Sequence, residues 1–126
     1  MSGSALTGRR VLCVEDETLI AMLLEDILIE LGCEVIGPFA SVAPALHALE
    51  STHVDAAVLD VNLRGRRSYA VADALTRMGR PFVFITGYGE EGLDPAYRGA
   101  AVVQKPFSAE KVAEALERAR WMAKGT

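Results

Sequence analysis

The chain has 126 residues, of which 51% are hydrophobic, and its formal net charge at pH 7 is −4. This length suits one domain with a substantial core, and the sequence pI of about 5.2 argues against nucleic-acid binding, which usually requires a basic surface. No apolar run is long enough to cross a membrane or to act as an export signal, so we expect a cytoplasmic protein with no membrane and no nucleic-acid partner.

Five apolar runs predict β-strands, and the segments between them have apolar residues at helical spacing. Residues 1–8 are small and polar and predict a flexible tail, which is followed by a single domain over residues 9–124. The expected strands are 11–14, 33–39, 56–60, 82–85 and 100–103. The expected helices begin near Thr18, Ser41, Ser68, Pro95 and Ser108, with a polar loop from Arg64 to Arg67. This alternation predicts an α/β fold, a doubly wound five-stranded parallel sheet with helices on both faces.

The apolar spacing also predicts which residues form the core. On the first helix the inward residues are expected to be Ile20, Leu23, Leu24, Ile27 and Leu31, and on the third they are Val71, Ala74, Leu75 and Met78. Cys13 and Cys33 lie within apolar runs and lack the spacing of a metal pair. We expect both to be small, buried, reduced residues.

Polar side chains follow the carboxyl ends of four expected strands. They are Glu15 and Asp16 after the first, Asp60 at the end of the third, Thr86 after the fourth and Lys105 after the fifth. Because open α/β sheets bind ligands at this edge, we expect these side chains to share one pocket. Each residue alone has a simpler interpretation as a solvated strand end, but their joint placement favours a site.

The three carboxylates predict a metal site with a lysine beside it. Like charges held close together raise one another's pKa, so a proton or a cation is needed, and oxygen ligands with Asn62 nearby suit Mg²⁺. The Lys105 ammonium can hold an oxygen of a bound phosphoryl group, and Pro106 makes a cis peptide bond a candidate for fixing its position. The Thr86 hydroxyl can donate to the same oxygen, or it can cap a helix.

The pattern of Glu15-Asp16, Asp60, Thr86 and Lys105-Pro106 resembles the receiver domain of two-component response regulators. The resemblance implies the strand order 2-1-3-4-5 and makes Asp60 the phosphoacceptor, with Thr86 as the switch hydroxyl and Lys105 as the phosphoryl-binding amine. It also implies a Mg²⁺ site. Its protein ligands would be Asp60, Asp16 directly, Glu15 through water, and the backbone carbonyl of Asn62.

The stretch from Pro81 to Gly89 resembles a receiver subgroup with a Phe-Ala-Thr-Gly motif, with Ile85 in place of the alanine. Single-domain members are common in that subgroup, and its kinases are often of the HWE or second HisKA type.

The family resemblance implies a phosphoacceptor rather than a conventional enzyme. Its phosphoryl group would come from a sensor histidine kinase or a phosphotransfer protein. The output would be contact with an unknown downstream protein, a phosphorelay or a phosphate sink, and a homodimer through the fourth helix, fifth strand and last helix is compatible with it.

One departure concerns the switch. Most receivers carry an aromatic residue two positions before the lysine that rotates inward on phosphorylation, and this chain has Val103 there. Tyr88, two residues after Thr86, is a candidate substitute, although it also suits an exposed loop.

Three other function classes fit less well. A haloacid-dehalogenase-like phosphatase uses an aspartyl phosphate but needs a second aspartate where this chain has Asn62. A flavodoxin-like binding protein needs a Ser/Thr/Gly-rich loop after the first strand, where this chain has Glu15, Asp16 and Glu17. An interaction domain that has lost phosphorylation would leave the five site residues unexplained.

Overall fold

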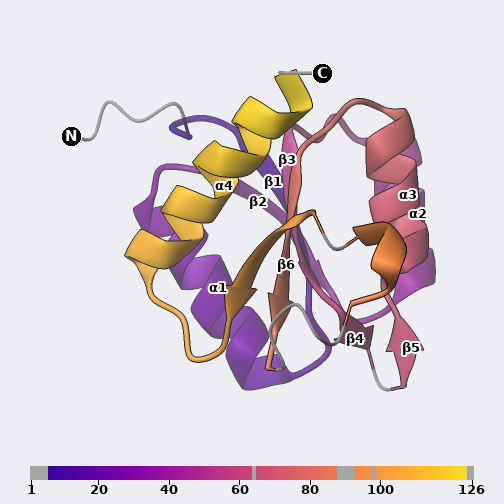
Figure 1. The fold of residues 1–126 in the computed structure, drawn as a ribbon. Helices are drawn as coiled ribbons and strands as arrows, with labels where there is room; N and C mark the ends of the chain where they lie inside the picture. Colours follow the sequence, from indigo (N-terminus) through magenta and orange to yellow (C-terminus); the bar gives the residue numbers. More distant parts are fainter. Residues whose placement is uncertain (1–5, 64, 88–92, 98, 125–126) are drawn as a thin grey trace.

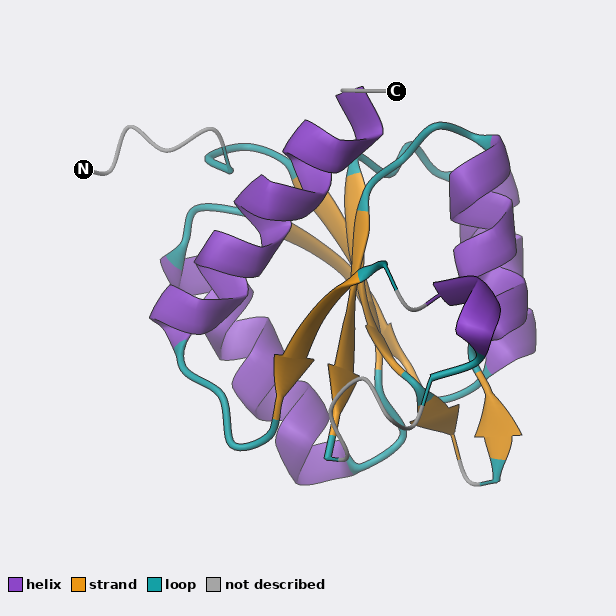
Figure 2. Cartoon of the chain, in the orientation of Figure 1, coloured by secondary structure: helices purple, strands orange, loops and turns teal. Residues whose placement is uncertain are grey.

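The fold is a central parallel sheet covered by helices on both faces (Figures 1 and 2). The computed structural model describes residues 6–63, 65–87, 93–97 and 99–124, with side chains described as far as residue 119. The strands of the sheet are β1 (Arg10–Val14), β2 (Glu34–Phe39), β3 (Ala56–Asp60), β6 (Phe82–Thr86) and β7 (Ala101–Gln104). The order in space is β2-β1-β3-β6-β7, all parallel. Counted within this sheet alone, it is the predicted order 2-1-3-4-5.

The helices form the two outer layers. They are α1 (Thr18–Glu30), α2 (Val42–Ser51), α3 (Tyr69–Arg77) and α4 (Ala109–Lys124). One face of the sheet packs on α1 and α4, and the other packs on α2 and α3 (Figure 1). Among the described residues between β6 and β7 there is only a short 3₁₀ helix, η2 (Pro95–Tyr97), where a brief helix was predicted. No helix in the described part of the chain combines the length and the apolar character of a membrane span.

The central strands explain why the sheet has two cores. Along β1, Val11 and Cys13 face α1 and α4, whereas Leu12 and Val14 face α2 and α3. All five residues of β3 are buried, as expected for a parallel strand that is covered on both sides. The site-bearing strand β3 is therefore fixed at the middle of the fold.

The two cysteines are part of the core, as predicted. Cys13 and Cys33 are buried free thiols in the layer that packs on α1 and α4. Burial raises the pKa of Cys13 to about 12, so this thiol stays protonated at neutral pH.

The predicted inward faces of two helices are partly wrong. On α1 the buried residues are Ala21, Leu24, Ile27 and Leu28, whereas Leu23 is 45% exposed. This helix is apolar around most of its circumference, so the spacing of its large residues did not identify the face that meets the sheet. On α3 the helix ends at Arg77, and Met78, which follows it, is 43% exposed.

The polar loop predicted at Arg64 to Arg67 is also wrong in part. Strands β4 (Asn62–Leu63) and β5 (Arg66–Arg67) form a small antiparallel pair outside the main sheet (Figure 1). Leu63 is buried and holds the pair to the domain, while Gly65 takes a φ of +86° in the turn. Residue 64 lies outside the described residues. Two-residue strands of this kind give no periodic signal that a sequence could show.

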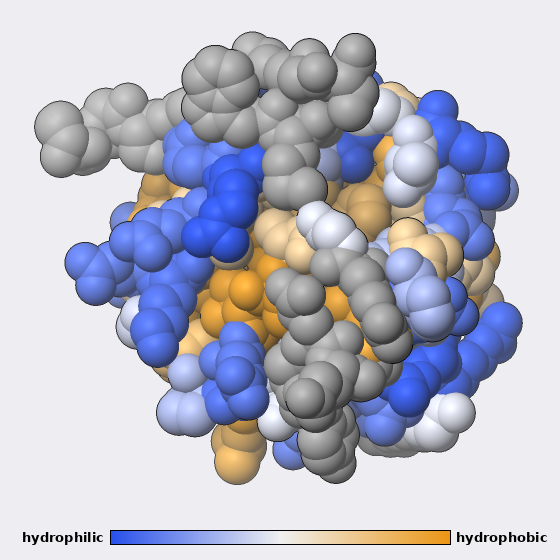
Figure 3. Space-filling view, viewed as in Figure 1, coloured by the Kyte–Doolittle hydropathy of each residue, from blue (hydrophilic) through white to orange (hydrophobic). Residues whose placement is uncertain are grey.

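Strand β7 lies at the edge of the sheet, and apolar surface is visible around it. Figure 3 shows hydrophobic residues gathered in the middle of this face, over β7, with hydrophilic residues beside them. Val102 of β7 is only half-buried, whereas Ala101 and Val103 are buried.

Candidate functional site

The predicted site residues meet at the carboxyl edge of the sheet because each one ends or directly follows a parallel strand. Glu15 follows β1, Asp60 is the last residue of β3, and Thr86 is the last residue of β6. Glu15, Asp60 and Thr86 are all buried, although each carries a polar group. Tyr88, the candidate switch aromatic, lies outside the described residues.

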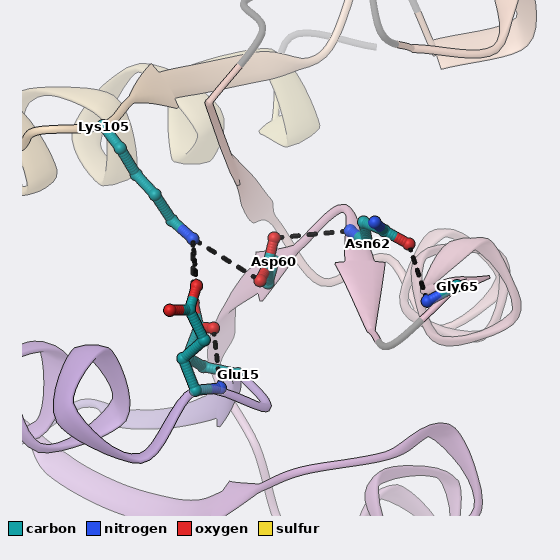
Figure 4. A network of polar contacts seen from close by, with 6 residues as sticks. Glu15, Asp60, Asn62, Gly65 and Lys105 are labelled. Carbon is teal, nitrogen blue, oxygen red and sulfur yellow. Dashed lines mark hydrogen bonds and ion pairs between the residues drawn. The ribbon is translucent and has the colours of Figure 1, made fainter.

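Lys105 points into the same pocket and is shared among three carboxylates. Its Nζ lies 3.6 Å from Oδ2 of Asp60, 3.6 Å from Oε1 of Glu15 and 3.7 Å from Oε1 of Glu17. Figure 4 shows the lysine side chain reaching toward both Glu15 and Asp60. Sequence reasoning missed Glu17 as a partner of Lys105. The sequence feature that could have indicated this contact is the unbroken acidic run from Glu15 to Glu17.

The backbone fixes where Lys105 begins. Its N–H donates to the carbonyl oxygen of Thr86 at 2.8 Å, which continues the pairing of β6 with β7 by one residue. The Lys105–Pro106 peptide bond is cis, as the sequence suggested. A second cis bond, Gly37–Pro38, was not predicted.

Asp60 is held from its other side by the backbone that follows it. Its Oδ1 accepts the N–H of Asn62 at 3.3 Å, while Oδ2 faces Lys105 (Figure 4). The Asn62 side chain turns away, because its Oδ1 accepts the N–H of Gly65 at 3.2 Å in the β4–β5 turn. The carboxylate therefore has its own hydrogen-bond donor, and the amide of Asn62 stabilises the turn.

The donor set fits a hard divalent cation. Glu15, Asp16 and Asp60 each offer a carboxylate oxygen, and these oxygens lie within 4.8 Å of one another. Among the described residues, Oε1 of Glu15 is buried and accepts no hydrogen bond, although it lies 3.6 Å from Nζ of Lys105. A buried, unsatisfied carboxylate oxygen costs free energy unless a cation or a proton compensates it. Receiver domains typically bind Mg²⁺ in such an acidic pocket, and these oxygen ligands suit that ion.

The carboxylates of the pocket are crowded, and this crowding sets their electrostatics. Burial, together with the nearby Asp60 carboxylate, raises the pKa of Glu15 to about 8. Burial alone lowers the pKa of Lys105, but the carboxylates of Asp60, Glu15 and Glu17 outweigh that effect and raise it. The pocket thus holds its ammonium firmly and tends to keep one carboxyl protonated.

The directions of the side chains on β6 and β7 show that Val103, the position expected to take part in a switch, lies on the opposite side of the sheet from Thr86. Val103 packs into the core beneath α1 and α4. Side chains alternate along a strand, so Thr86 shares its face with Phe84, and Phe84 pairs with Val102 on β7. The residue of β7 on the same side as the Thr86 hydroxyl is therefore Val102, not Val103.

An aromatic cluster, which sequence reasoning missed, occupies that face. The rings of Tyr69 and Tyr97 are stacked with centroids 4.8 Å apart, and Phe84 meets both edge-on at 5.9 and 5.6 Å. The hydroxyl of Tyr69 accepts the N–H of Asp94 at 2.7 Å. The cluster therefore ties the start of α3 to the segment that follows β6, next to Thr86.

Known proteins resemble this chain over most of its length. The family described as "Response regulator receiver domain" matches residues 11–117. The solution structure of SdrG from Sphingomonas melonis Fr1 is 49% identical with a TM-score of 0.79, covering 90% of this chain and 96% of that one. SdrG has also been solved in a BeF3-activated conformation, with 47% identity, a TM-score of 0.77, and coverage of 93% of this chain and 98% of that one.

A curated relative is longer than this chain. The transcriptional regulatory protein PdtaR from Mycobacterium tuberculosis is 32% identical over 117 residues, which are 90% of this chain and 57% of that protein. The chain therefore spans little more than half the length of this relative. The family match over residues 11–117, the strand order and the acidic pocket with its lysine lead to one conclusion: the chain belongs to the response regulator receiver domain family.

Proposed function

We propose that Asp60 accepts a phosphoryl group from a phosphohistidine on a sensor histidine kinase or a phosphotransfer protein. The observation that carries this proposal is the position of Lys105, whose Nζ lies 3.6 Å from Asp60 Oδ2 inside a pocket with two more acids. An ammonium so placed can offset charge on a phosphoryl group that bonds to Asp60. The BeF3-activated conformation of SdrG supports it, since BeF3 is a chemical mimic of a phosphoryl group.

The transfer is one displacement at phosphorus. A carboxylate oxygen of Asp60 forms the new O–P bond while the P–N bond of the donor breaks, and the imidazole nitrogen leaves with the electron pair and takes up a proton. The pocket contributes mainly by positioning and by electrostatics. Lys105 donates to a phosphoryl oxygen, and the N–H of Asn62 orients the Asp60 carboxylate.

The Mg²⁺ ligands would be the carboxylates of Asp16 and Asp60 and the backbone carbonyl of Asn62, with Glu15 acting through water. The ion would supply positive charge between the nucleophile and the phosphoryl oxygens. The protein is a phosphoacceptor that assists its own phosphorylation and dephosphorylation rather than an enzyme with a separate substrate.

The acyl phosphate carries about one and a half to two negative charges at the end of β3, in place of the single charge of the Asp60 carboxylate. The Thr86 hydroxyl then donates to a phosphoryl oxygen, and the segment after β6 moves with it. The surface of η2, β7 and α4 carries the change to a downstream protein, to a second copy of the chain, or to a relay or sink partner.

The kinase is of the HWE or second HisKA type, and the free buried thiols agree with a cytoplasmic location.

Intact mass after incubation with Mg²⁺ and acetyl phosphate tests this proposal. One added phosphoryl group is expected on the wild type, and none on Asp60→Asn or in the presence of a chelator. An adduct on Asp60→Asn would mean that another residue is the acceptor. If the wild type stays unmodified while Mg²⁺ binding is demonstrated, the proposal fails.

A further inference from the structure

Glu17 lies at the mouth of the pocket and contacts the site in two ways. Its backbone N–H donates to Oε2 of Glu15 at 3.1 Å, and its own Oε1 lies 3.7 Å from Nζ of Lys105. Its side chain is 66% exposed, whereas those of Glu15 and Asp60 are 0% and 8% exposed. Glu17 is thus the solvent-facing member of the three acids around Lys105.

The distances show that Lys105 is shared rather than committed to one acid. An ammonium has three donors, and here it faces three carboxylates at nearly equal separations of 3.6 to 3.7 Å. All three separations exceed those of a strong charge-assisted hydrogen bond, about 2.7 to 2.9 Å. A phosphoryl group on Asp60 brings new acceptor oxygens, so Lys105 must turn away from some of its present partners. The contact with the exposed Glu17 is the least costly to give up, because water solvates that carboxylate readily.

We propose that Glu17 is a positioning residue, whose carboxylate competes with the incoming phosphoryl group for Lys105 and restrains phosphorylation by small dianionic phosphodonors. This inference rests on the proposed phosphoacceptor role of Asp60. The position of the charge supports it, because the Glu17 carboxylate lies on the solvent-facing side of the pocket, where a donor must enter. A small dianion meets that charge directly.

The test measures the second-order rate constant for phosphorylation by acetyl phosphate, at saturating Mg²⁺ and low ionic strength, from intact mass against time. For Glu17→Gln we expect a rate constant about three- to tenfold above wild type, the scale of removing one charge near a dianion at a protein surface. Glu17→Asp keeps the charge and should stay close to wild type. Glu50→Gln, which removes an exposed acid near the end of α2, is the matched control and should leave the rate unchanged.

Salt dependence separates an electrostatic role from a structural one. The wild-type rate should rise as salt screens Glu17, and the Glu17→Gln rate should change less, so that the two converge. A Glu17→Gln rate equal to or below wild type overturns the inference, and so does an equal gain in Glu50→Gln. In those cases the wild type still carries an adduct, so the role of Asp60 stands. If the wild type itself takes no phosphoryl group, the proposed function fails and the inference fails with it.

Discussion

The backbone N–H of Lys105 donates to the carbonyl oxygen of Thr86 at 2.8 Å, so the main chain joins the two residues that would hold a phosphoryl group. Thr86 ends β6, and Lys105 follows the edge strand β7. The ammonium is thereby placed by the register of two strands and not only by the conformation of a long side chain. A movement of Thr86 toward a phosphoryl group must also act on the start of Lys105.

Lys105→Ala should lower the rate of phosphorylation by acetyl phosphate. Among the described residues this ammonium is the only cation within ion-pair distance of Asp60, and removing one preorganised stabilising donor costs about 10²–10³ in rate. The measurement is the rate of phosphoryl incorporation by intact mass at saturating Mg²⁺.

Lys111→Ala is the control for that substitution. Lys111 is exposed in the first turn of α4, so its removal takes away the same charge from the protein without touching the pocket. Equal losses in the two variants would show that overall charge, and not the contact with Asp60, sets the rate.

Mg²⁺ binding should depend on pH through Glu15. Burial and the neighbouring Asp60 raise the pKa of this carboxyl to about 8 from an ordinary 4.5, so the folded protein keeps a proton that the unfolded chain loses. The free energy of unfolding without metal therefore falls as pH rises from 4.5 toward 8. A bound cation displaces this proton, so the apparent Mg²⁺ affinity should rise by up to about tenfold per pH unit below 8 and level off above it.

Calorimetric titration between pH 6 and 9 measures this dependence, and buffers of different ionisation enthalpy report the released proton. Glu15→Gln has no proton to release and should bind Mg²⁺ more weakly, with a flatter pH profile. A wild-type affinity that does not change between pH 6 and 8 would contradict the raised pKa of Glu15.

The sequence predicted the sheet and most of the site because both depend on strand ends. An apolar run that stops on a polar residue marks where a buried strand emerges, and this pattern alone predicts that Asp60, Thr86 and Glu15 lie at one edge. The proline after Lys105 made a cis bond a candidate there, and the bond is cis. The location of the site follows from patterns only a few residues long, whereas the strand order is what the family resemblance implies.

The contacts that the sequence missed depend on where side chains point in three dimensions. Glu17 is one of three adjacent acids, and only the direction of the chain after β1 shows that it reaches Lys105. Tyr69 and Tyr97 lie 28 residues apart, and their stacking depends on how the segment after β6 folds back over α3. Strand alternation could have assigned Val102 rather than Val103 to the face of Thr86, but only once the register of β6 with β7 was known.

Tyr69→Phe should loosen the segment around Asp94 while leaving the stacked rings in place. The substitution removes the oxygen that accepts the Asp94 N–H at 2.7 Å, at a cost of about 1 kcal/mol in the free energy of unfolding. Hydrogen exchange should be faster at Asp94, with little change in β3.

Tyr97→Phe is the matched control, because it removes a hydroxyl that makes a longer contact, 3.4 Å to the carbonyl oxygen of Tyr69. Its effect on stability should be smaller. If Tyr97→Phe destabilises the domain as much as Tyr69→Phe, the short hydrogen bond is not what holds the segment.

Asp55→Asn should destabilise the domain at neutral pH and remove part of its sensitivity to acid. Oδ2 of Asp55 accepts the N–H of Arg10 at the start of β1, and Oδ1 lies 2.8 Å from Nε2 of His53. Burial alone raises the pKa of Asp55, but these two partners outweigh it and lower it. The stabilisation by Asp55 is therefore fully present above its unfolded-state pKa of about 3.8. It is lost as the pH falls through the lower pKa of the folded state.

Urea denaturation at pH 7, 5, 4 and 3 measures this effect. At pH 7 we expect a loss of about 1–2 kcal/mol in Asp55→Asn, typical of weakened hydrogen bonds to a charged group, and this difference from wild type should shrink below pH 4. His53→Ala keeps the Arg10 contact and should lose only part of the stability. A difference that stays constant down to pH 3 would show that the charge of Asp55 contributes nothing, and that the side chain acts through its shape and neutral hydrogen bonds alone.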